Sequence, residues 1–299
     1  MKILLFGKNG QVGWELQRSL APLGELVALD SDSTELCGDF TNLGGIAQTV
    51  RAVSPDVIVN AAAHTAVDKA ESEPELVRTI NALVPGVLAQ EAQRGKAWLI
   101  HYSTDYVFDG SGVKPWQETD ATAPLSVYGA TKLEGERLIQ QADCRHLIFR
   151  TSWVYGTRGG NFAKTMLRLA QERDSLNVIN DQIGAPTGAD LLADITAHAI
   201  RAARQQPEMS GLYHLVAAGE TSWHGYASFV LDFARRAGIP LKVATGAVQP
   251  VHTSAFPTPG KRPHNSRMDT AKLRHTFGLN LPVWQSGVTR MLSELLEKS

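Results

Sequence analysis

The chain has 299 residues, and at about 150 residues per domain this length suggests two domains. Its 43% hydrophobic and 20% charged residues are an ordinary globular composition, which excludes collagen, a disordered chain and a disulfide scaffold. The 29 basic and 30 acidic residues give a net charge of −1. A balance so close to zero argues against nucleic acid and anionic lipid surfaces as partners.

Cysteine usage and the N-terminus bear on the cellular location. Cys37 and Cys144 provide neither a disulfide framework nor a paired spacing for zinc, which is typical of a reducing compartment. The N-terminal apolar run is shorter than a signal-peptide core, and no later run reaches the roughly 20 residues of a membrane span. We therefore expect a cytoplasmic protein with no membrane partner.

Short apolar runs alternate with longer segments of helical period along the first half of the chain. Strands are expected at 2–6, 25–29, 57–60, 98–103 and 146–150, with helices near 11–20, 43–53, 75–94 and 128–141. This alternation is typical of βαβ units, and nearly continuous apolar strands indicate a sheet covered on both faces. The sequence therefore predicts an α/β fold with a doubly wound parallel sheet of the Rossmann type.

A glycine-rich loop joins the first strand to the first helix. It reads Gly7-Lys8-Asn9-Gly10-Gln11-Val12-Gly13. A dinucleotide pyrophosphate needs a backbone without obstructing Cβ atoms and free N–H groups at a helix N-terminus. We expect this loop, including Asn9, Gln11 and Val12, to bind such a cofactor. The alternative is a glycine turn required only for tight packing.

The second strand ends at an acidic residue. Asp30 stands 17 positions after Gly13, close to the spacing at which an acidic residue contacts the adenosine ribose. A carboxylate there accepts hydrogen bonds from ribose hydroxyls and repels a 2′-phosphate, so we expect use of NADH with tolerance of NADPH. Asp39, Phe40 and residues 61–63 also follow strands, where a ligand would cross the sheet edge. Their alternative roles are turn formation and small-residue packing.

A tyrosine and a lysine lie four residues apart in the segment Tyr128-Gly-Ala-Thr-Lys132. This spacing places both side chains on one face of a helix. A nearby cation favours the phenolate, so such a pair can exchange a proton near neutral pH. Thr104 follows the fourth strand and can bond a substrate oxygen beside Tyr128. The alternatives are a packed aromatic, a solvated lysine and a helix-capping threonine.

The pattern is less regular after residue 155. We expect a loop at 156–160, a helix at 162–172, a strand and helix within 189–215, an irregular proline-containing stretch at 245–267 and a closing helix near 284–297. Residues 1–155 and 187–218 are predicted to form the dinucleotide-binding domain. Residues 156–186 and 219–299 are predicted to form a smaller, interleaved substrate domain.

Together these residues resemble the extended short-chain dehydrogenase/reductase superfamily and, within it, the dTDP-4-dehydrorhamnose reductases. The segments that carry the resemblance are 7–13, 60–71, 103–110, 128–132, 150–156, 181–187 and 262–266. His64 departs from the tyrosine expected at its position, which affects only a local cofactor contact. The resemblance covers nearly the whole chain, and its segments are specific in combination.

The resemblance implies NAD(P)H-dependent reduction of the C4 keto group of dTDP-4-dehydro-L-rhamnose to dTDP-L-rhamnose, for bacterial surface polysaccharide. Tyr128 would donate a proton to the C4 oxygen, and Thr104 would bond the same oxygen. Lys132 would hold the nicotinamide ribose and lower the pKa of the tyrosine. Cofactor contacts are expected from Ala62, Ala63, His64 and Thr65, and contacts to the sugar nucleotide from Asp105 and Trp153.

The resemblance also implies a homodimer with a magnesium ion at the contact between its subunits. The sequence assigns no ligands to that ion. Glu15, Glu294 and Glu297 are interpreted as solvated helix carboxylates.

Two other functions stay open at this point. The first is a nucleotide-sugar dehydratase or epimerase on the same scaffold. Related dehydratases carry an Asp-Glu pair after the threonine, whereas here Tyr106 follows Asp105, and Asp105 alone cannot act as both acid and base. Glu118 or Asp120 would have to move in as a substitute. The second is a regulatory NADP-binding subunit, against which the intact Tyr128 and Lys132 argue.

Overall fold

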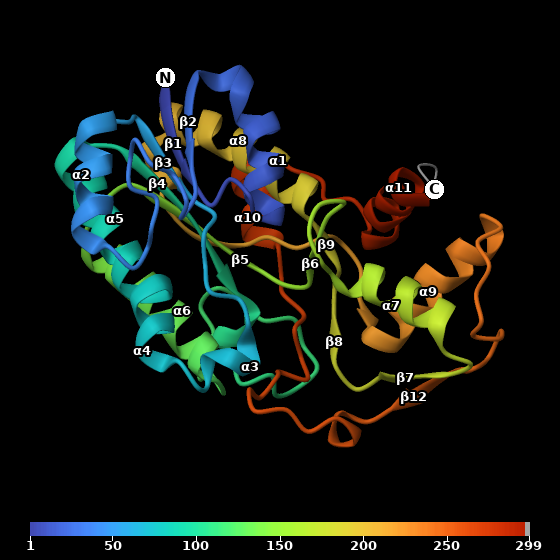
Figure 1. The fold of residues 1–299 in the computed structure, drawn as a ribbon. Coiled ribbons are helices and arrows are strands. Elements are labelled where there is room, and N and C mark those ends of the chain that lie inside the picture. The colour runs from blue at the N-terminus through green and yellow to red at the C-terminus, as the bar shows by residue number, and fades with distance from the viewer. Residues whose placement is uncertain (297–299) are drawn as a thin grey trace.

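The computed structural model describes residues 1–296, and its centre is a parallel sheet (Figure 1). Within the described residues, six strands form this sheet in the order β10-β5-β4-β3-β1-β2. The strands are β1 (Lys2–Phe6), β2 (Glu25–Leu29), β3 (Val57–Asn60), β4 (Trp98–Thr104), β5 (His146–Thr151) and β10 (Gly211–His214). Each neighbouring pair runs parallel. The predicted α/β fold with a doubly wound parallel sheet is confirmed.

Helices cover both faces of the sheet (Figure 1). The helices of this part are α1 (Gln11–Leu20), α2 (Leu43–Val53), α3 (Val67–Ala70), α4 (Pro74–Arg78), α5 (Val84–Gly95), α6 (Val127–Gln141) and α8 (Ala189–Gln205). Alternate residues of β1 show the division: Ile3 packs in the cluster with α1 and α8, and Leu4 packs in the cluster with α2 and α5. Burial on both faces is why the strands are nearly continuous apolar runs.

A second group of elements surrounds a separate apolar cluster at the right of Figure 1. Its helices are α7 (Phe162–Glu172), α9 (Trp223–Arg236) and α11 (Trp284–Leu296). Its short strands pair as β7 (Leu176–Ile179) with β12 (Val248–Val251), β8 (Ile183–Gly184) with β11 (Thr221–Ser222), and β6 (Val154–Tyr155) with β9 (Thr187–Gly188). Single turns of 3-10 helix lie at Ala21–Leu23, Asp105–Val107, Pro207–Met209 and Thr253–Ala255.

The structure differs from the sequence predictions in several places. The helix expected at 75–94 is divided by the π-helix Thr79–Leu83, which precedes Pro85 in the first turn of α5. The segment 189–215 runs helix first and strand second, and helix α9 was not predicted. The irregular stretch at 245–267 contains the short strand β12. Glu297 lies outside the described residues.

The predicted domain division stays a prediction, but one segment departs from it. Residues 271–277 lie in the range 219–299 that was predicted for the substrate domain, and they form helix α10 (Ala271–Phe277), which was not predicted. Its Leu273 and Phe277, and the following Leu281, instead pack into the cluster of the central sheet. A division by residue range does not show which of two cores a segment joins. Among residues 1–296, no helix is long and apolar enough to cross a membrane.

A buried ion pair fixes helix α6 to the sheet. Arg150 of β5 and Glu136 of α6 form two hydrogen bonds of 2.9 and 2.6 Å, and their side chains are only 4% and 2% exposed. The guanidinium also lies 5.0 Å from the centre of the Phe108 ring. A charge so deeply buried is tolerated only while its partner is present. The pair therefore makes the position of α6 depend on the position of β5.

The helix also carries a matched control for this pair. Glu134 of α6 pairs with Arg78 at 2.6 Å, the same separation as in the buried pair, but the side chains are 33% and 47% exposed. We expect Glu136→Gln to lower the free energy of unfolding by about 3 kcal/mol or more, because it leaves Arg150 uncompensated. Glu134→Gln should cost about 1 kcal/mol or less. Urea denaturation of both variants measures the difference, and equal losses would contradict this role of the buried pair.

Candidate functional site

The carboxyl ends of β4 and β5 and the N-terminal half of α6 form the first part of the site. Ser126 caps α6 by accepting a hydrogen bond from the Gly129 amide at 3.2 Å. A Cβ at Gly129 would lie 2.2 Å from the Tyr106 carbonyl oxygen, so only glycine allows this approach. The contact brings Tyr128 beside the segment that follows β4. In an open parallel sheet, this edge is where ligands bind.

Tyr128 is partly buried and packs edge to face against Tyr106, with ring centres 5.4 Å apart. Burial raises the pKa of the phenol to about 12; Thr104 lowers it by hydrogen bonding, and the Asp105 carboxylate raises it. The expectation that Lys132 lowers this pKa is not met, because the lysine amine faces the Tyr102 carbonyl oxygen at 2.5 Å and His101 at 3.2 Å. Tyr128 is therefore a protonated phenol at neutral pH.

Thr104 and Asp105 follow directly in the chain, and both are at least 96% buried. The Thr104 hydroxyl donates to an Asp105 carboxylate oxygen at 3.1 Å and accepts from the Tyr106 amide at 3.2 Å. Burial raises the pKa of Asp105 to about 6, against hydrogen bonds from Ser266 and Thr104. The structure thus brings the predicted Thr104, Asp105 and Tyr128 to one place.

Nearby hydroxyl groups have no partner inside the protein. Among the described residues, the buried hydroxyls of Ser103, Thr151 and Ser152 make no hydrogen bond. They lie at the carboxyl ends of β4 and β5, beside the predicted catalytic residues. Buried polar groups are normally paired, so unpaired ones at one sheet edge are typical of a site that a polar ligand completes.

The glycine loop has the geometry of a phosphate site. Gly7 has a φ of +85°, and a Cβ at Gly13 would lie 1.9 Å from the Gly7 carbonyl oxygen, so both glycines are required by the protein itself. A Cβ at Gly10 would meet only this oxygen, at 3.4 Å. No side chain of the described residues caps α1, and its first turn has no acidic residue. Its free N–H groups and the space above Gly10 are therefore open to an anion.

Residues around the loop connect it to its neighbours. The Asp30 carboxylate accepts hydrogen bonds from the amides of Asn9 and Ser31 at 2.9 and 2.8 Å, so it joins the loop to the end of β2. Gln11 faces the loop at 156–159, and a Cβ at Gly159 would lie 3.4 Å from its side chain. Val12 packs against the cluster of the central sheet.

Asp39 and Phe40 have structural roles in this chain. Phe40 is buried and packs against Phe6, with ring centres 5.5 Å apart. The Asp39 carboxylate accepts hydrogen bonds from the amide and hydroxyl of Thr41 at 2.9 and 2.8 Å. Phe40 thus has a packing role and Asp39 a role in the turn, which were the alternative interpretations of these residues. Contact of this segment with a cofactor stays a prediction.

The loop after β3 lies beside the glycine loop. A Cβ at Gly7 would be 2.7 Å from the Ala62 amide nitrogen. Ala63 is partly buried and Thr65 is exposed. The Asn81 side chain holds the His64 backbone from both sides, at 2.9 Å to its amide and 3.0 Å to its carbonyl oxygen. Sequence analysis missed Asn81, since only the π-helix places it there.

A cavity of about 310 Å³ extends from Tyr106 into the second group of elements. Trp153 lines it, with an unusual φ of +50° and a ring stacked on Trp223 at a centre distance of 3.6 Å. Arg262 lines the same cavity and pairs with Asp68 at 2.8 Å. Tyr106 therefore connects two predicted site residues, because it lines the cavity together with Trp153 and packs against Tyr128. Trp223 belongs to no recognisable sequence motif, so its position in this cavity was not predicted.

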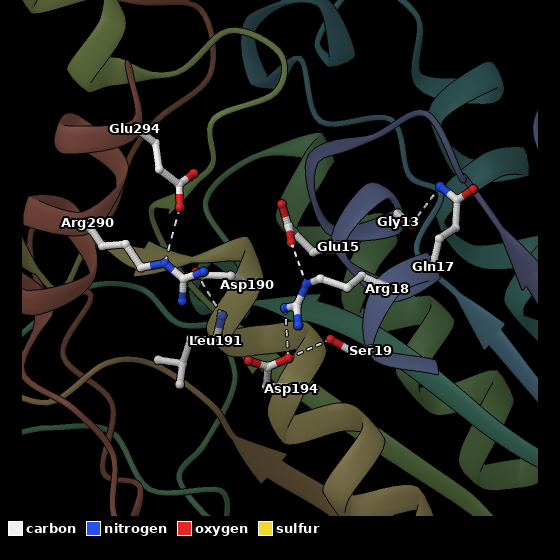
Figure 2. Close-up of polar contacts among 10 residues, drawn as sticks. All are labelled: Gly13, Glu15, Gln17, Arg18, Ser19, Asp190, Leu191, Asp194, Arg290 and Glu294. Carbon is white, nitrogen blue, oxygen red and sulfur yellow. Dashed lines mark hydrogen bonds and ion pairs between the residues drawn. The ribbon is translucent and has the colours of Figure 1, made fainter. Parts of the chain in front are cut away.

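Figure 2 shows the carboxylates that bear on the expected magnesium ion. Glu15 faces Arg18 at 3.4 Å, and Arg290 faces both Asp190 at 3.7 Å and Glu294 at 3.2 Å. Each of these three carboxylates is thus paired with an arginine side chain and is not grouped with other possible metal ligands. Within residues 1–296, no group of three or more His, Cys, Asp or Glu is arranged to hold a metal ion. The described residues of one chain therefore identify no ligands for the expected magnesium ion.

Comparison with known proteins gives consistent results. The model of the family described as the RmlD substrate binding domain matches residues 1–297. The dTDP-4-dehydrorhamnose reductase of Escherichia coli K12 is 64% identical over 295 residues, which cover 99% of this chain and 98% of that protein. A solved structure named dTDP-4-dehydrorhamnose reductase, from Clostridium acetobutylicum, is 36% identical, with a TM-score of 0.89 over 99% of both chains.

A second solved structure is a complex with a cofactor. It is the dTDP-4-dehydrorhamnose reductase of Bacillus anthracis in complex with NADP, which is 35% identical, with a TM-score of 0.88 over 98% of this chain and 99% of that one. Family match, sequence identity and structural similarity all extend over essentially the whole chain. The chain belongs to the dTDP-4-dehydrorhamnose reductase family.

Proposed function

We propose that this protein reduces the C4 keto group of dTDP-4-dehydro-L-rhamnose to dTDP-L-rhamnose with NADH or NADPH. The observation that carries the proposal is the placement of Tyr128, on the face of α6 that packs against Tyr106, next to Thr104 and Asp105 at the carboxyl edge of the sheet. These residues lie between a glycine loop open to an anion and the cavity lined by Trp153. The names of the relatives support the same reaction.

The chain's own residues supply the proton. When bound, the reduced nicotinamide supplies a hydride to C4 of the sugar. Tyr128 would donate its proton to the C4 oxygen as negative charge develops there, and the Thr104 hydroxyl, whose single proton points to Asp105 in this structure, would turn it to the same oxygen. Because burial keeps the pKa of Tyr128 at about 12, the phenol stays protonated over the physiological pH range. Lys132 holds the ribose next to the nicotinamide.

The remaining predicted residues bind the two ligands. Gly10 and the first turn of α1 hold the pyrophosphate, and Asp30 holds the adenosine ribose. Residues Ala62, Ala63, His64 and Thr65 line the cofactor. Asp105 and Trp153 contact the sugar nucleotide from the cavity side. The substrate domain comprises residues 156–186 and 219–299, except for residues 271–281, which pack against the central sheet.

The structure favours a reductase over a dehydratase. A dehydratase needs a second carboxylate near Asp105, and Tyr106 occupies the next position. The two substitutes are held elsewhere: Glu118 accepts a hydrogen bond from the His214 amide at 2.9 Å, and Asp120 accepts one from the Gln117 amide at 2.8 Å. Neither carboxylate is free to move to the sugar without breaking its own contact.

A homodimer and a bound magnesium ion follow from the resemblance, a cytoplasmic location follows from the cysteine usage and the short N-terminal apolar run, and all three stay predictions. Sedimentation velocity before and after treatment with EDTA tests the first two together. A dimer that dissociates on chelation supports both predictions, and a protein that is monomeric in both buffers contradicts the homodimer.

The proposed function is tested by incubating the purified protein with NADPH and dTDP-4-dehydro-L-rhamnose. We expect NADPH oxidation and, by NMR, formation of dTDP-L-rhamnose rather than its C4 epimer. A parallel incubation with dTDP-glucose and NAD⁺ should give no 4-keto-6-deoxy chromophore in alkali. Cofactor binding without turnover would support the regulatory subunit instead, and catalytic formation of the chromophore would support the dehydratase.

Tyr128→Phe removes the proton donor and keeps the ring that packs against Tyr106. We expect kcat to fall by about 10²–10⁴, the usual contribution of a positioned general acid, while NADPH binding changes little. Tyr102→Phe is the control, because that phenol bonds Thr196 at 2.6 Å on the far side of β4 and should leave kcat nearly unchanged. Steady-state kinetics and fluorescence titration measure both quantities. A Tyr128→Phe enzyme close to wild type contradicts the assignment.

Asp30→Ala tests the ribose contact. The carboxylate also holds the Asn9 amide, so the variant should bind both cofactors more weakly. Because the repulsion of a 2′-phosphate is lost as well, the ratio of kcat/KM for NADPH to that for NADH should rise. The exposed neighbour Asp32, changed to Ala, serves as the control and should leave the ratio unchanged. A ratio that moves toward NADH contradicts the contact.

A further inference from the structure

A guanidinium group beside the proposed cofactor site has no anionic partner. Arg158 is exposed and lies in the loop that joins β6 to α7, and its Cζ atom is 3.9 Å from the centre of the Trp14 ring. Its guanidinium makes no hydrogen bond or ion pair with any residue in 1–296. Glu15, which follows Trp14 in α1, is already paired with Arg18 at 3.4 Å (Figure 2). Within the described residues, Arg158 is thus a cation without a counter-ion.

The geometry of α1 places this cation over the first turn of the helix. Trp14 stands four residues after Gly10, which precedes α1, and three after Gln11, which begins it. Side chains at these spacings share one face of a helix, and each leans toward the N-terminus of the helix. The guanidinium stacked on Trp14 therefore lies on the side of α1 where the helix begins, next to the N–H groups assigned to the cofactor pyrophosphate.

The backbone of the loop is fixed, but the Arg158 side chain is not. Lys164 Nζ donates hydrogen bonds to the carbonyl oxygens of Thr157 and Gly159, the second at 2.8 Å. These two residues flank Arg158, so its backbone is held on both sides. Its side chain is held by one ring contact only. Rotation of the side chain, without movement of the loop, is therefore enough to take the guanidinium from Trp14 to a neighbouring group.

The same loop contacts the first residue of α1. A Cβ at Gly156 would lie 3.7 Å from Gln11 Oε1, and a Cβ at Gly159 would lie 3.4 Å from Gln11 Cγ. The Gln11 oxygen is buried and has no hydrogen-bond partner among the described residues. Buried polar atoms are normally paired. An unpaired one here is typical of a junction that is completed by a ligand, or by a side chain that the ligand moves.

A pyrophosphate is the anion that this position favours. Hydrogen bonds from a guanidinium to phosphate are charge-assisted and often bidentate, whereas a cation–π contact with an exposed ring is weaker. The 2′-phosphate of NADPH has the same chemistry, but it belongs beside Asp30 at the end of β2. The loop of Arg158 follows β5 and β6, and three strands separate β5 from β2 in the sheet. Its position therefore favours the pyrophosphate at the start of α1.

We propose that Arg158 binds the pyrophosphate of the dinucleotide cofactor and is held on Trp14 until the cofactor arrives. The inference rests on the proposed function only in placing a dinucleotide at the N-terminus of α1. Arg158 lies in the range 156–186 that was predicted for the substrate domain. Both parts of the chain thus contribute to the cofactor site, and the cofactor contact made by Arg158 lies outside the glycine loop.

Equilibrium binding, followed by NADH and NADPH fluorescence without substrate, tests the contact. We expect Arg158→Ala to raise the Kd of both dinucleotides about tenfold or more, the usual effect of losing a hydrogen bond to a charged group. Arg168→Ala is the control, because it removes the same charge from an exposed position on α7, where Arg168 pairs with Glu172 at 3.0 Å. It should leave both constants unchanged. Wild-type affinity of Arg158→Ala for both dinucleotides would overturn the proposal.

Comparison of NADH with NADPH separates the two sources of phosphate. Both dinucleotides contain the pyrophosphate, so the ratio of their Kd values should be the same in Arg158→Ala as in the wild type. A loss of affinity for NADPH alone assigns Arg158 to the 2′-phosphate and contradicts the proposal. A wild-type protein that binds neither dinucleotide contradicts the proposed function as well, whereas unchanged binding in Arg158→Ala contradicts this inference alone.

Release of the guanidinium from Trp14 is observed by ¹⁹F NMR of the full-length protein labelled with 5-fluorotryptophan. The Trp14 signal is assigned by its loss in Trp14→Phe. We expect NAD⁺ to shift this signal toward its position in Arg158→Ala, because the guanidinium is absent from the ring in both cases. In Arg158→Ala itself, NAD⁺ should cause little further shift. A Trp14 signal that NAD⁺ leaves in place in the wild type is the result that rules out the release.

Trp14→Leu separates this role from a merely structural one. Leucine removes the ring that holds the guanidinium and keeps an apolar side chain that favours a helix. We expect the Kd for NADH to stay the same or to fall by up to about fivefold, the worth of an exposed cation–π contact. If Arg158 and Trp14 only stiffen the loop, Trp14→Leu should weaken NADH binding as much as Arg158→Ala does, and that result contradicts the proposal.

Discussion

The close approach of helix α6 to its neighbours is the constraint on which the rest of the site depends. At two positions on this helix a Cβ would collide with backbone: Gly129 with the Tyr106 carbonyl oxygen at 2.2 Å, and Gly135 with the Asn81 carbonyl oxygen at 2.3 Å. The first contact sets the depth of Tyr128 beside the end of β4. The second brings the π-helix against α6, and it is from this π-helix that Asn81 holds the His64 backbone. The two glycine contacts of α6 therefore position the proton donor and the cofactor loop, respectively.

Such close packing explains how buried charges become part of the site. Tyr128, Lys132 and Glu136 stand at intervals of four residues and share one face of α6. Glu136 is compensated by Arg150, whereas Lys132 faces neutral partners, His101 and the Tyr102 carbonyl. Burial then acts alike on the phenol and the amine, since it disfavours the charged form of each. Burial thus raises the pKa of Tyr128 to about 12 and lowers the pKa of Lys132 to about 8.

Local pattern predicted those parts of the fold and site that depend on contiguous residues. The bounds of β1, β2 and β3, the glycine loop and the spacing of Tyr128 and Lys132 are all local features. His101 and Asn81 were not identified, because their partners come from other strands and helices. The pKa of Tyr128 was expected to fall and instead rises, since a sequence shows the nearby lysine but not the burial that outweighs it.

The C-terminal half completes the site through the segment 258–266. Glycine again permits the approach, because a Cβ at Gly260 would lie 2.7 Å from the Val67 side chain. Arg262 binds both oxygens of Asp68, at 3.0 and 2.8 Å, and Ser266 hydrogen-bonds the buried Asp105. The environment of Asp105 therefore depends on residues more than 150 positions further along the chain. Because this segment lines the cavity and also contacts Asp105, the acid–base site is complete only with the C-terminal half packed against the sheet.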